Sequence, residues 1–206
     1  MPLYEPSASP DEAAQRALAA RSEAAQYSLR VFRSLEQDLL DFERHVPLEA
    51  NHLKVFSVEL WSVILRACAE VDSQLHSVLN ELGLASGDTD RRLYREAEAH
   101  LRLGWFEFRT VPTPMDLVPF GSFLQSPPKS PGWWRDYNAV KHNRIGAIRA
   151  ATFENALDSV AGVAAVLLRQ WGPDLFPRPL YLNASGDYSA PFPSRLLTLE
   201  KMPWQR

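Results

Sequence analysis

The sequence predicts an all-α fold: a bundle of about four to five helices with a long Pro- and aromatic-rich loop and an extended C-terminal arm. Apolar residues recur at spacings of three, four and seven over most of residues 1–171, as on the buried faces of amphipathic helices. Helix start and stop signals bracket these stretches. We therefore divide the chain into a helical domain (1–171) and a Pro-rich arm (172–206) that packs on the domain or on a partner.

The first helix is predicted to run from Ser9 to His45. Ser9 is a capping residue, Pro10 suits the first helical position, and Glu12 completes a capping box. Pro47 ends the helix, because a proline disfavours helical geometry at the residue before it. A seven-residue repeat marks the buried stripe: Leu18, Ala25, Phe32, Leu39 and Val46.

Two further helices are predicted before residue 104. One begins between Asn51 and Ser57 and ends at Gly83, which suits the left-handed position after a helix. The other, from Asp88 to Leu103, has a weaker apolar stripe, and we expect it on the surface. The stronger stripe alternates spacings of three and four: Leu60, Ile64, Ala67, Val71, Leu75, Val78 and Leu82.

Two proline-rich segments are predicted to be irregular. Between Val111 and Pro131 the chain has six prolines, and residues 104–128 are also rich in aromatic side chains. We expect a loop there, with room for one short strand at 105–111. A loop of this length usually carries function or wraps a surface. The C-terminal arm has another six prolines and a turn-like segment at 183–187, which favours a hairpin.

Two helices lie between these irregular segments. Ser130 and Pro131 start one that runs from Trp133 to Arg144 and stops at Gly146. The last helix begins near Thr152. Its apolar stripe alternates spacings of four and three: Phe153, Leu157, Val160, Ala164, Leu167 and Trp171.

Composition excludes several classes of protein. The single cysteine, Cys68, leaves no internal disulfide framework and no Cys-based zinc site. The N-terminus has neither the basic start nor the apolar core of a signal peptide. The longest apolar run, Val160 to Leu168, is far too short to span a membrane. We therefore expect a cytoplasmic protein with no membrane association.

The net charge of −3 excludes a strongly basic nucleic-acid coat but allows a local basic patch. From residue 129 to residue 149, five cations face one carboxylate, Asp136, which gives a local balance of +4. An anionic ligand would be attracted there by the local field. The five cations are Lys129, Arg135, Lys141, Arg144 and Arg149.

The predicted helix at 133–144 places a cation, an amide and an imidazole on one face. Arg135 and His142 are seven residues apart, about 10 Å along a helix, and Asn138 lies between them. Histidine exchanges protons near neutral pH, and arginine grips phosphate oxygens in pairs. Cutting RNA without a metal requires an acid, a base and positive charge over the phosphorane. One histidine cannot comfortably act as both acid and base, so two copies from a symmetric dimer would complete a site.

Neighbouring residues extend this candidate site. Trp134 and Tyr137 are candidates for stacking on bases, since every base has a π face. Lys141 and Arg144 are candidates for contacts with phosphates. The structural alternatives stay open at this point. The aromatic residues can be core anchors, and Arg135 can pair with a neighbouring acid. Lys141 and Arg144 can lie in solvent at a helix end, where the helix dipole favours cations.

We expect neither a cofactor nor a metal ion. The chain lacks a phosphate-cradling glycine loop, a Gly-x-Ser-x-Gly elbow and a Cys–His nucleophile arrangement. It also lacks the Glu-x-x-His spacing of helical di-iron bundles. The enzyme classes that depend on these motifs have no support in the sequence.

The pattern resembles the HEPN superfamily, a group of all-α domains in which a late helix carries Arg, a polar residue and, after four to six intervening positions, His. Arg135, Asp136 and His142 match that motif, with six residues between the arginine and the histidine. The resemblance covers about residues 10–171. The surrounding Trp-Trp-x-x-Tyr-Asn-x-x-Lys-His-x-Arg signature is not part of the general motif and indicates a narrower branch.

The resemblance implies a homodimer with a composite cleft, acting on RNA as a metal-independent endoribonuclease in a toxin–antitoxin or other defence system, with an antitoxin or another protein partner. In that hypothesis His142 transfers protons, Arg135 stabilises the phosphorane, and Asn138 orients the histidine or the phosphate. Many HEPN domains are non-catalytic, so two alternatives stay open. One is a helical dimerisation or nucleotide- or RNA-binding module, and the other is a structural cluster that joins the Pro-rich loop to the bundle.

Overall fold

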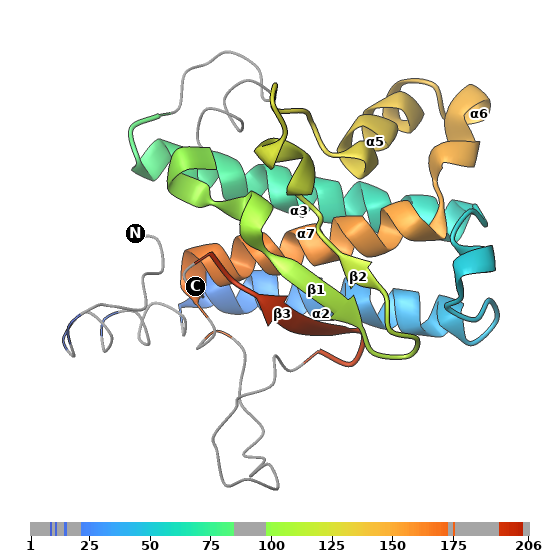
Figure 1. Cartoon of the computed structure of the whole chain (residues 1–206), viewed down its shortest axis with the longest axis horizontal. Coiled ribbons are helices and arrows are strands. Elements are labelled where there is room, and N and C mark those ends of the chain that lie inside the picture. Colours follow the sequence, from blue (N-terminus) through green and yellow to red (C-terminus); the bar gives the residue numbers. More distant parts are fainter. Residues whose placement is uncertain are drawn as a thin grey trace, which may run out of the picture.

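The computed structural model describes residues 22–84, 98–172 and 194–203, together with residues 9, 11, 15 and 175. Within them three long helices lie side by side, and a small antiparallel sheet covers one side of these helices (Figure 1). The chain is therefore mainly helical, as predicted, but the described part is not an exclusively helical bundle. None of the described helices combines the length and apolar character that crossing a bilayer requires.

Helix α2 spans Glu23–Glu43 and begins at Ser22, whose hydroxyl accepts a hydrogen bond from the backbone N–H of Ala25 at 3.3 Å. Ser22 has a ψ of 156°, so a helix cannot continue through it unbroken. The single helix predicted from residue 9 to residue 45 is therefore wrong at this point, and most of the stretch before Ser22 lies outside the described residues. Part of the predicted stripe is buried in α2: Ala25, Phe32 and Leu39.

Helix α3 spans Val58–Glu81 and has the predicted bounds. Its N-cap, Ser57, accepts the backbone N–H three residues further on at 3.1 Å. Gly83 follows the helix with a φ of 71°, a left-handed conformation that favours glycine. The helix predicted for 88–103 is described only from residue 98; it ends at Leu101, after which Arg102 is left-handed with a φ of 53°.

Helix α7 (Phe153–Trp171) is the centre of the fold. Every residue of α7 except Glu154, Asn155 and Asp158 is buried. Helices α2, α3 and α5 (Gly132–His142) pack against it, and Figure 1 shows α7 between α2 and α3. A helix covered on so many sides is apolar almost all round, and α7 follows this rule.

The close approach of α5 to α7 depends on a glycine. A Cβ atom at Gly162 would lie 3.0 Å from Cζ2 and 3.3 Å from Cη2 of Trp133. The indole N–H of Trp133 donates a hydrogen bond to the carbonyl of Pro119 at 2.7 Å, and its ring meets Phe120 edge-on with centroids 5.6 Å apart. Gly162 therefore lets a large aromatic ring lie directly on the backbone of α7.

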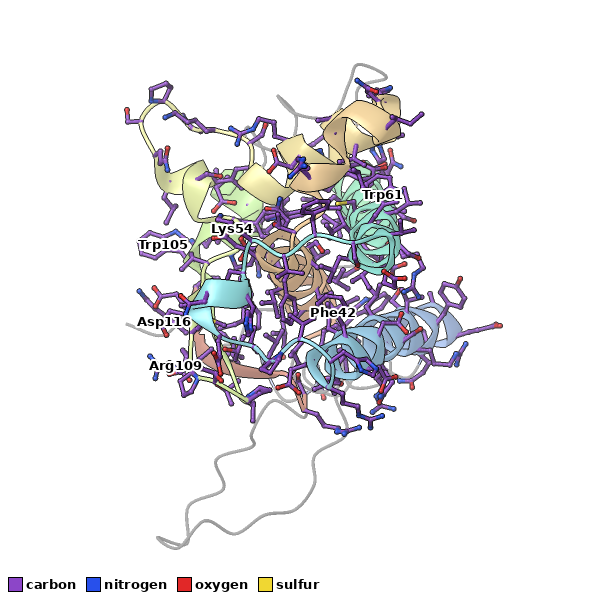
Figure 2. The ribbon with its side chains drawn as sticks, turned by 90° about the vertical axis from the view of Figure 1, so that its right-hand side faces the viewer. Phe42, Lys54, Trp61, Trp105, Arg109 and Asp116 are labelled. Atoms are coloured by element: carbon purple, nitrogen blue, oxygen red, sulfur yellow. The ribbon has the colours of Figure 1, made fainter. Side chains whose placement is uncertain are left out.

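The sheet joins segments that are distant in the sequence. Strand β1 (Glu107–Thr110) pairs antiparallel with β2 (Asp116–Leu117) on one side and with β3 (Leu197–Lys201) on the other. Figure 2, turned by 90°, shows the sheet to one side of the three long helices, which are seen nearly end-on. Strand β3 belongs to the predicted C-terminal arm, so this part of the arm packs on the domain. The predicted hairpin at 183–187 lies outside the described residues.

A buried carboxylate on α2 anchors the chain just before β3. Glu36 accepts hydrogen bonds from the hydroxyl of Ser194 and from the backbone N–H groups of Arg195, at 2.7 Å, and Leu196, at 3.1 Å. A carboxylate in an apolar interior needs such donors, because burial without them costs several kcal/mol. The anchor places β3 beside α2 before the strand joins the sheet.

A second partly buried carboxylate closes the turn that leads into β1. Glu98 accepts the backbone N–H of Leu103 at 3.0 Å and that of Gly104 at 2.9 Å. Burial raises the pKa of Glu98 to about 7, although the two hydrogen bonds and the charge of Arg169 act in the opposite direction. The folded chain therefore binds a proton at Glu98 more tightly than an unfolded chain does.

Gly162→Val tests the contact between α5 and α7. We expect the valine to lower the free energy of unfolding by about 1–3 kcal/mol, because its side chain overlaps the ring of Trp133. Urea denaturation measures the change. Gly132→Val is the matched control, since a Cβ there has no neighbour within 4 Å, and an equal loss in both variants would contradict the proposed contact.

Glu98→Gln tests the raised pKa. A carboxyl group with a folded pKa of about 7 and an ordinary unfolded value near 4.3 stabilises the fold fully below the lower value, and this contribution is lost as the pH rises through 7. We expect the wild type to lose about 1–2 kcal/mol more stability than the variant between pH 5 and pH 8, allowing for partial exposure. Urea midpoints at both pH values measure this, with exposed Glu49→Gln as the control. Equal slopes in wild type and Glu98→Gln would contradict it.

Candidate functional site

Helix α5 has one buried face, which is aromatic. Tyr137 stacks on Trp61 of α3 with ring centroids 6.1 Å apart, and Figure 2 shows Trp61 on the part of α3 near α5 and α6 (Arg144–Ala147). Trp134 meets Tyr137 edge-on, with centroids 6.1 Å apart. The four buried residues of α5 are spaced as one helical face: Trp133, Trp134, Tyr137 and Val140.

Arg135 and His142 lie on the exposed side of α5. The side chain of Arg135 is 71% exposed, and its Nε atom lies 3.7 Å from a carboxylate oxygen of Asp136. The other oxygen of Asp136 accepts a hydrogen bond from the side-chain amide of Asn155, on α7, at 2.9 Å. Because Asp136 is tied to α7, it positions the guanidinium while leaving most of it open to solvent. A purely structural cluster would instead bury the arginine and the histidine, and the structure buries neither.

Asn138 lies between these two residues and is half-buried. Its side-chain amide donates a hydrogen bond to the backbone carbonyl of Trp134, one turn earlier, at 3.0 Å. This bond orients the side chain along the helix. The amide oxygen is then the group that Asn138 can offer to a ligand or to a neighbouring imidazole.

The stacking role predicted for Trp134 and Tyr137 does not fit the structure. Their exposed fractions are only 7% and 8%, because both rings pack between α5 and its neighbours. A base needs access to one face of a ring, and these faces are already covered by protein. We correct this prediction: the two aromatic residues are core anchors that seat α5.

Helix α5 is shorter than predicted. It ends at His142, and Asn143, with φ −144° and ψ 70°, interrupts the helical backbone. The side chain of Asn143 caps α6 by accepting the backbone N–H of Gly146 at 3.1 Å. Arg144 therefore opens a separate helical turn and does not continue the face of Arg135 and His142. A phosphate contact by Arg144 stays a prediction.

Two cations at this end of the fold, Lys141 and Arg149, are held by aromatic rings. Lys141, His142 and Arg149 are exposed, and none of the three forms an ion pair within the described residues. The ammonium of Lys141 lies 5.3 Å from the ring centroid of Tyr137, and Cζ of Arg149 lies 5.1 Å from that of Phe56. A cation–π contact leaves the N–H donors of a cation open to an anion, whereas an ion pair occupies them.

Phe56 has no signal in the sequence, because it meets Arg149 only through tertiary contact. The backbone around it pairs with the start of α7: Phe56 and Thr152 form an isolated β-bridge, and the N–H of Phe153 donates to the carbonyl of Val55 at 2.9 Å. Nearby, on α6, Ile145 is 94% exposed. The short 3₁₀ turn that carries Arg149 (η4, Ile148–Ala150) packs against both α5 and α6.

A groove of about 510 Å³ lies between α2 and α3, and two of its three carboxylates are already paired. Asp38 binds Arg66, and Asp41 lies 3.0 Å from Arg44. Glu59 lies in the first turn of α3, where a carboxylate is stabilised by the helix dipole. We assign no chemistry to this groove.

Comparison of the chain with protein-family models, with curated proteins and with solved structures found no match. Within the described residues, no three His, Cys, Asp or Glu side chains gather closely enough to hold a metal ion. The candidate site is therefore defined by its geometry: an exposed guanidinium and imidazole on α5, with a lysine and a second arginine close by in the fold.

Stability measurements separate the exposed side chains of α5 from its anchors. We expect Arg135→Ala and His142→Ala to change the free energy of unfolding by less than about 0.5 kcal/mol, because both side chains are exposed. Trp134→Ala is expected to cost about 3–5 kcal/mol, since it empties a buried site. Urea denaturation of the three variants gives these values. If His142→Ala were as damaging as Trp134→Ala, the imidazole would be part of the core and not of a site.

Proposed function

We propose that the exposed side of α5 binds RNA, and that two copies of the chain join their Arg135–His142 faces into one metal-independent endoribonuclease site. The observation that carries this proposal is the common exposure of the guanidinium and the imidazole on α5. Lys141 and Arg149 add positive charge that no acid of the described residues neutralises by an ion pair. The resemblance to HEPN domains supports the same function and the same dimeric arrangement.

In this mechanism one copy of His142 takes the proton of a 2′-hydroxyl, whose oxygen attacks the adjacent phosphorus. The second copy of His142 protonates the 5′-oxygen as its bond to phosphorus breaks. Arg135 stabilises the charge on the phosphorane oxygens, and Asn138 orients the imidazole through its amide oxygen. The products are one RNA end with a 2′,3′-cyclic phosphate and one with a 5′-hydroxyl.

A second candidate function is an RNA- or nucleotide-binding module without catalysis. The two cation–π pairs support it, because they present donors to a phosphate whether or not a bond is cleaved. Each monomer also has only one imidazole on the exposed side of α5. A chain that did not dimerise would therefore lack either the catalytic acid or the catalytic base, and it could bind RNA without cleaving it.

Cleavage of mixed RNA in EDTA distinguishes the two functions. We expect the wild type to produce 2′,3′-cyclic phosphate ends. His142→Ala should lower the cleavage rate by about 10²–10⁴-fold, the usual contribution of a catalytic acid or base, and Arg135→Ala by about 10²–10³-fold, the usual contribution of a group that stabilises charge in the transition state. Gel electrophoresis with mapping of the ends measures rate and chemistry together.

His45→Ala and Arg33→Ala are matched controls, because they remove exposed side chains of the same types outside α5. Both controls are expected to cleave at the wild-type rate. Cleavage that survives His142→Ala, or that requires a divalent metal ion, would refute the catalytic assignment. Tight RNA binding by the wild type without any cleavage would favour the binding module.

A further inference from the structure

Phe56 and Arg149 form an exposed and positively charged surface. The guanidinium carbon of Arg149 lies 5.1 Å from the centroid of the Phe56 ring, which is the geometry of a cation–π contact. Phe56 remains 38% exposed, and Arg149 is exposed as well. Part of the aromatic ring and part of the guanidinium are therefore accessible to solvent.

The backbone beneath this pair is held in place. Hydrogen bonds from Ser57 to the Ala151 carbonyl, at 3.4 Å, and from Glu154 to the Leu53 carbonyl, at 3.0 Å, join the segment before α3 to the segment before α7. The β-bridge between Phe56 and Thr152 lies between these two bonds. The position of the pair is thus set by two elements of the core, which limits the entropy lost when a ligand binds.

The guanidinium of Arg149 lies over an aromatic ring, as that of Arg30 does over Tyr27 on α2 at 5.9 Å, and differs in this from the guanidinium groups of Arg66 and Arg109. Arg66 binds Asp38, and Arg109 binds Asp116 at 2.7 Å and reaches Glu200 at 3.6 Å. Arg149 has no such carboxylate among the described residues, and its neighbour is an aromatic ring. Its donors remain available, and its planar group can stack on a second ring.

The ligand chemistry follows from these features. Nucleobases that are not paired in a duplex stack on aromatic rings and on arginine planes, while arginine N–H donors contact phosphate oxygens. The turn that carries Arg149 packs against α5, so the pair belongs to the same end of the molecule as Arg135 and His142. A base bound to this surface would flank a phosphodiester held on α5.

We propose that Phe56 and Arg149 form the nucleobase-stacking platform of this protein, which receives an unpaired base of single-stranded RNA next to the phosphodiester bound on α5. This inference rests on the proposed function. Trp134 and Tyr137 are buried and cannot stack on a base, so the inference assigns that contact to Phe56 and Arg149. The platform recognises a stacked base in any sequence, because stacking is largely independent of base identity.

Binding of a fluorescent single-stranded 2′-O-methyl RNA, followed by fluorescence anisotropy, tests the platform. This RNA lacks the attacking hydroxyl, so affinity is measured without cleavage. The variants are Arg149→Lys, which keeps the positive charge but removes the planar guanidinium, and Phe56→Leu, which keeps an apolar side chain but removes the aromatic ring. An abasic oligomer of the same length supplies the phosphates without bases, and Arg33→Lys on α2 is the matched control.

We expect Arg149→Lys and Phe56→Leu each to weaken binding of the base-bearing RNA by roughly 5- to 100-fold. Their binding of the abasic oligomer and the RNA affinity of Arg33→Lys should stay within about two-fold of the wild type, because the charge is preserved. Urea denaturation checks that both variants are folded. If Phe56→Leu loses stability, the result for Arg149→Lys decides the test, because that variant is a conservative change on the surface.

The outcomes separate this inference from the function on which it rests. If the wild type binds the RNA and both variants bind it equally well, the platform is overturned and the RNA-binding face of α5 stands. If the variants weaken binding of the RNA and binding of the abasic oligomer to the same extent, Arg149 contacts only phosphate, and the stacking role is overturned. If the wild type binds neither oligomer, the proposed function fails and the platform fails with it.

Discussion

The packing of Trp133 on Gly162 is the contact from which the arrangement of the site follows. Helix α7 is buried on almost every side, so each neighbour must approach its backbone closely, and the missing Cβ at residue 162 makes room for an indole ring. The same indole binds the carbonyl of Pro119, which fastens the irregular loop to the helical core. Loop, α5 and α7 therefore meet at one glycine, and the rotation of α5 about its own axis is set there.

This rotation decides which side chains of α5 can act on a ligand. With Trp133, Trp134 and Tyr137 turned inward, Arg135 and His142 must face solvent, because they lie on the other side of the helix. The buried rings also affect the surface charge. Tyr137 holds the ammonium of Lys141 without neutralising it, and Phe56 does the same for Arg149, whereas Arg66 and Arg109 are bound to carboxylates. A basic surface with open donors is the result, on a chain whose net charge is −3.

Local signals predicted most helices and one strand, but not how the strands pair. Helices α3 and α7 have the expected bounds because their caps and apolar stripes are properties of short segments. Strand β1 lies within the short strand predicted at 105–111, but its partners had no local signal, since β3 comes from the C-terminal arm and its pairing depends on contacts such as Glu36 with Leu196. Two helix boundaries were missed, at Ser22 and at Asn143, where a capping side chain interrupts an otherwise helical pattern.

The sequence by itself determined that the chain is mainly helical, that Arg135, Asn138 and His142 are spaced to line up along one helix, and that positive charge gathers near them. Helical periodicity states which residues share a face, but it does not state which face another element covers. The tertiary structure decided that Trp134 and Tyr137 are inside, that Arg135 and His142 are outside, and that Phe56 meets Arg149. The physical reason is that burial depends on what packs against a side chain, and those neighbours come from parts of the chain that local patterns do not connect.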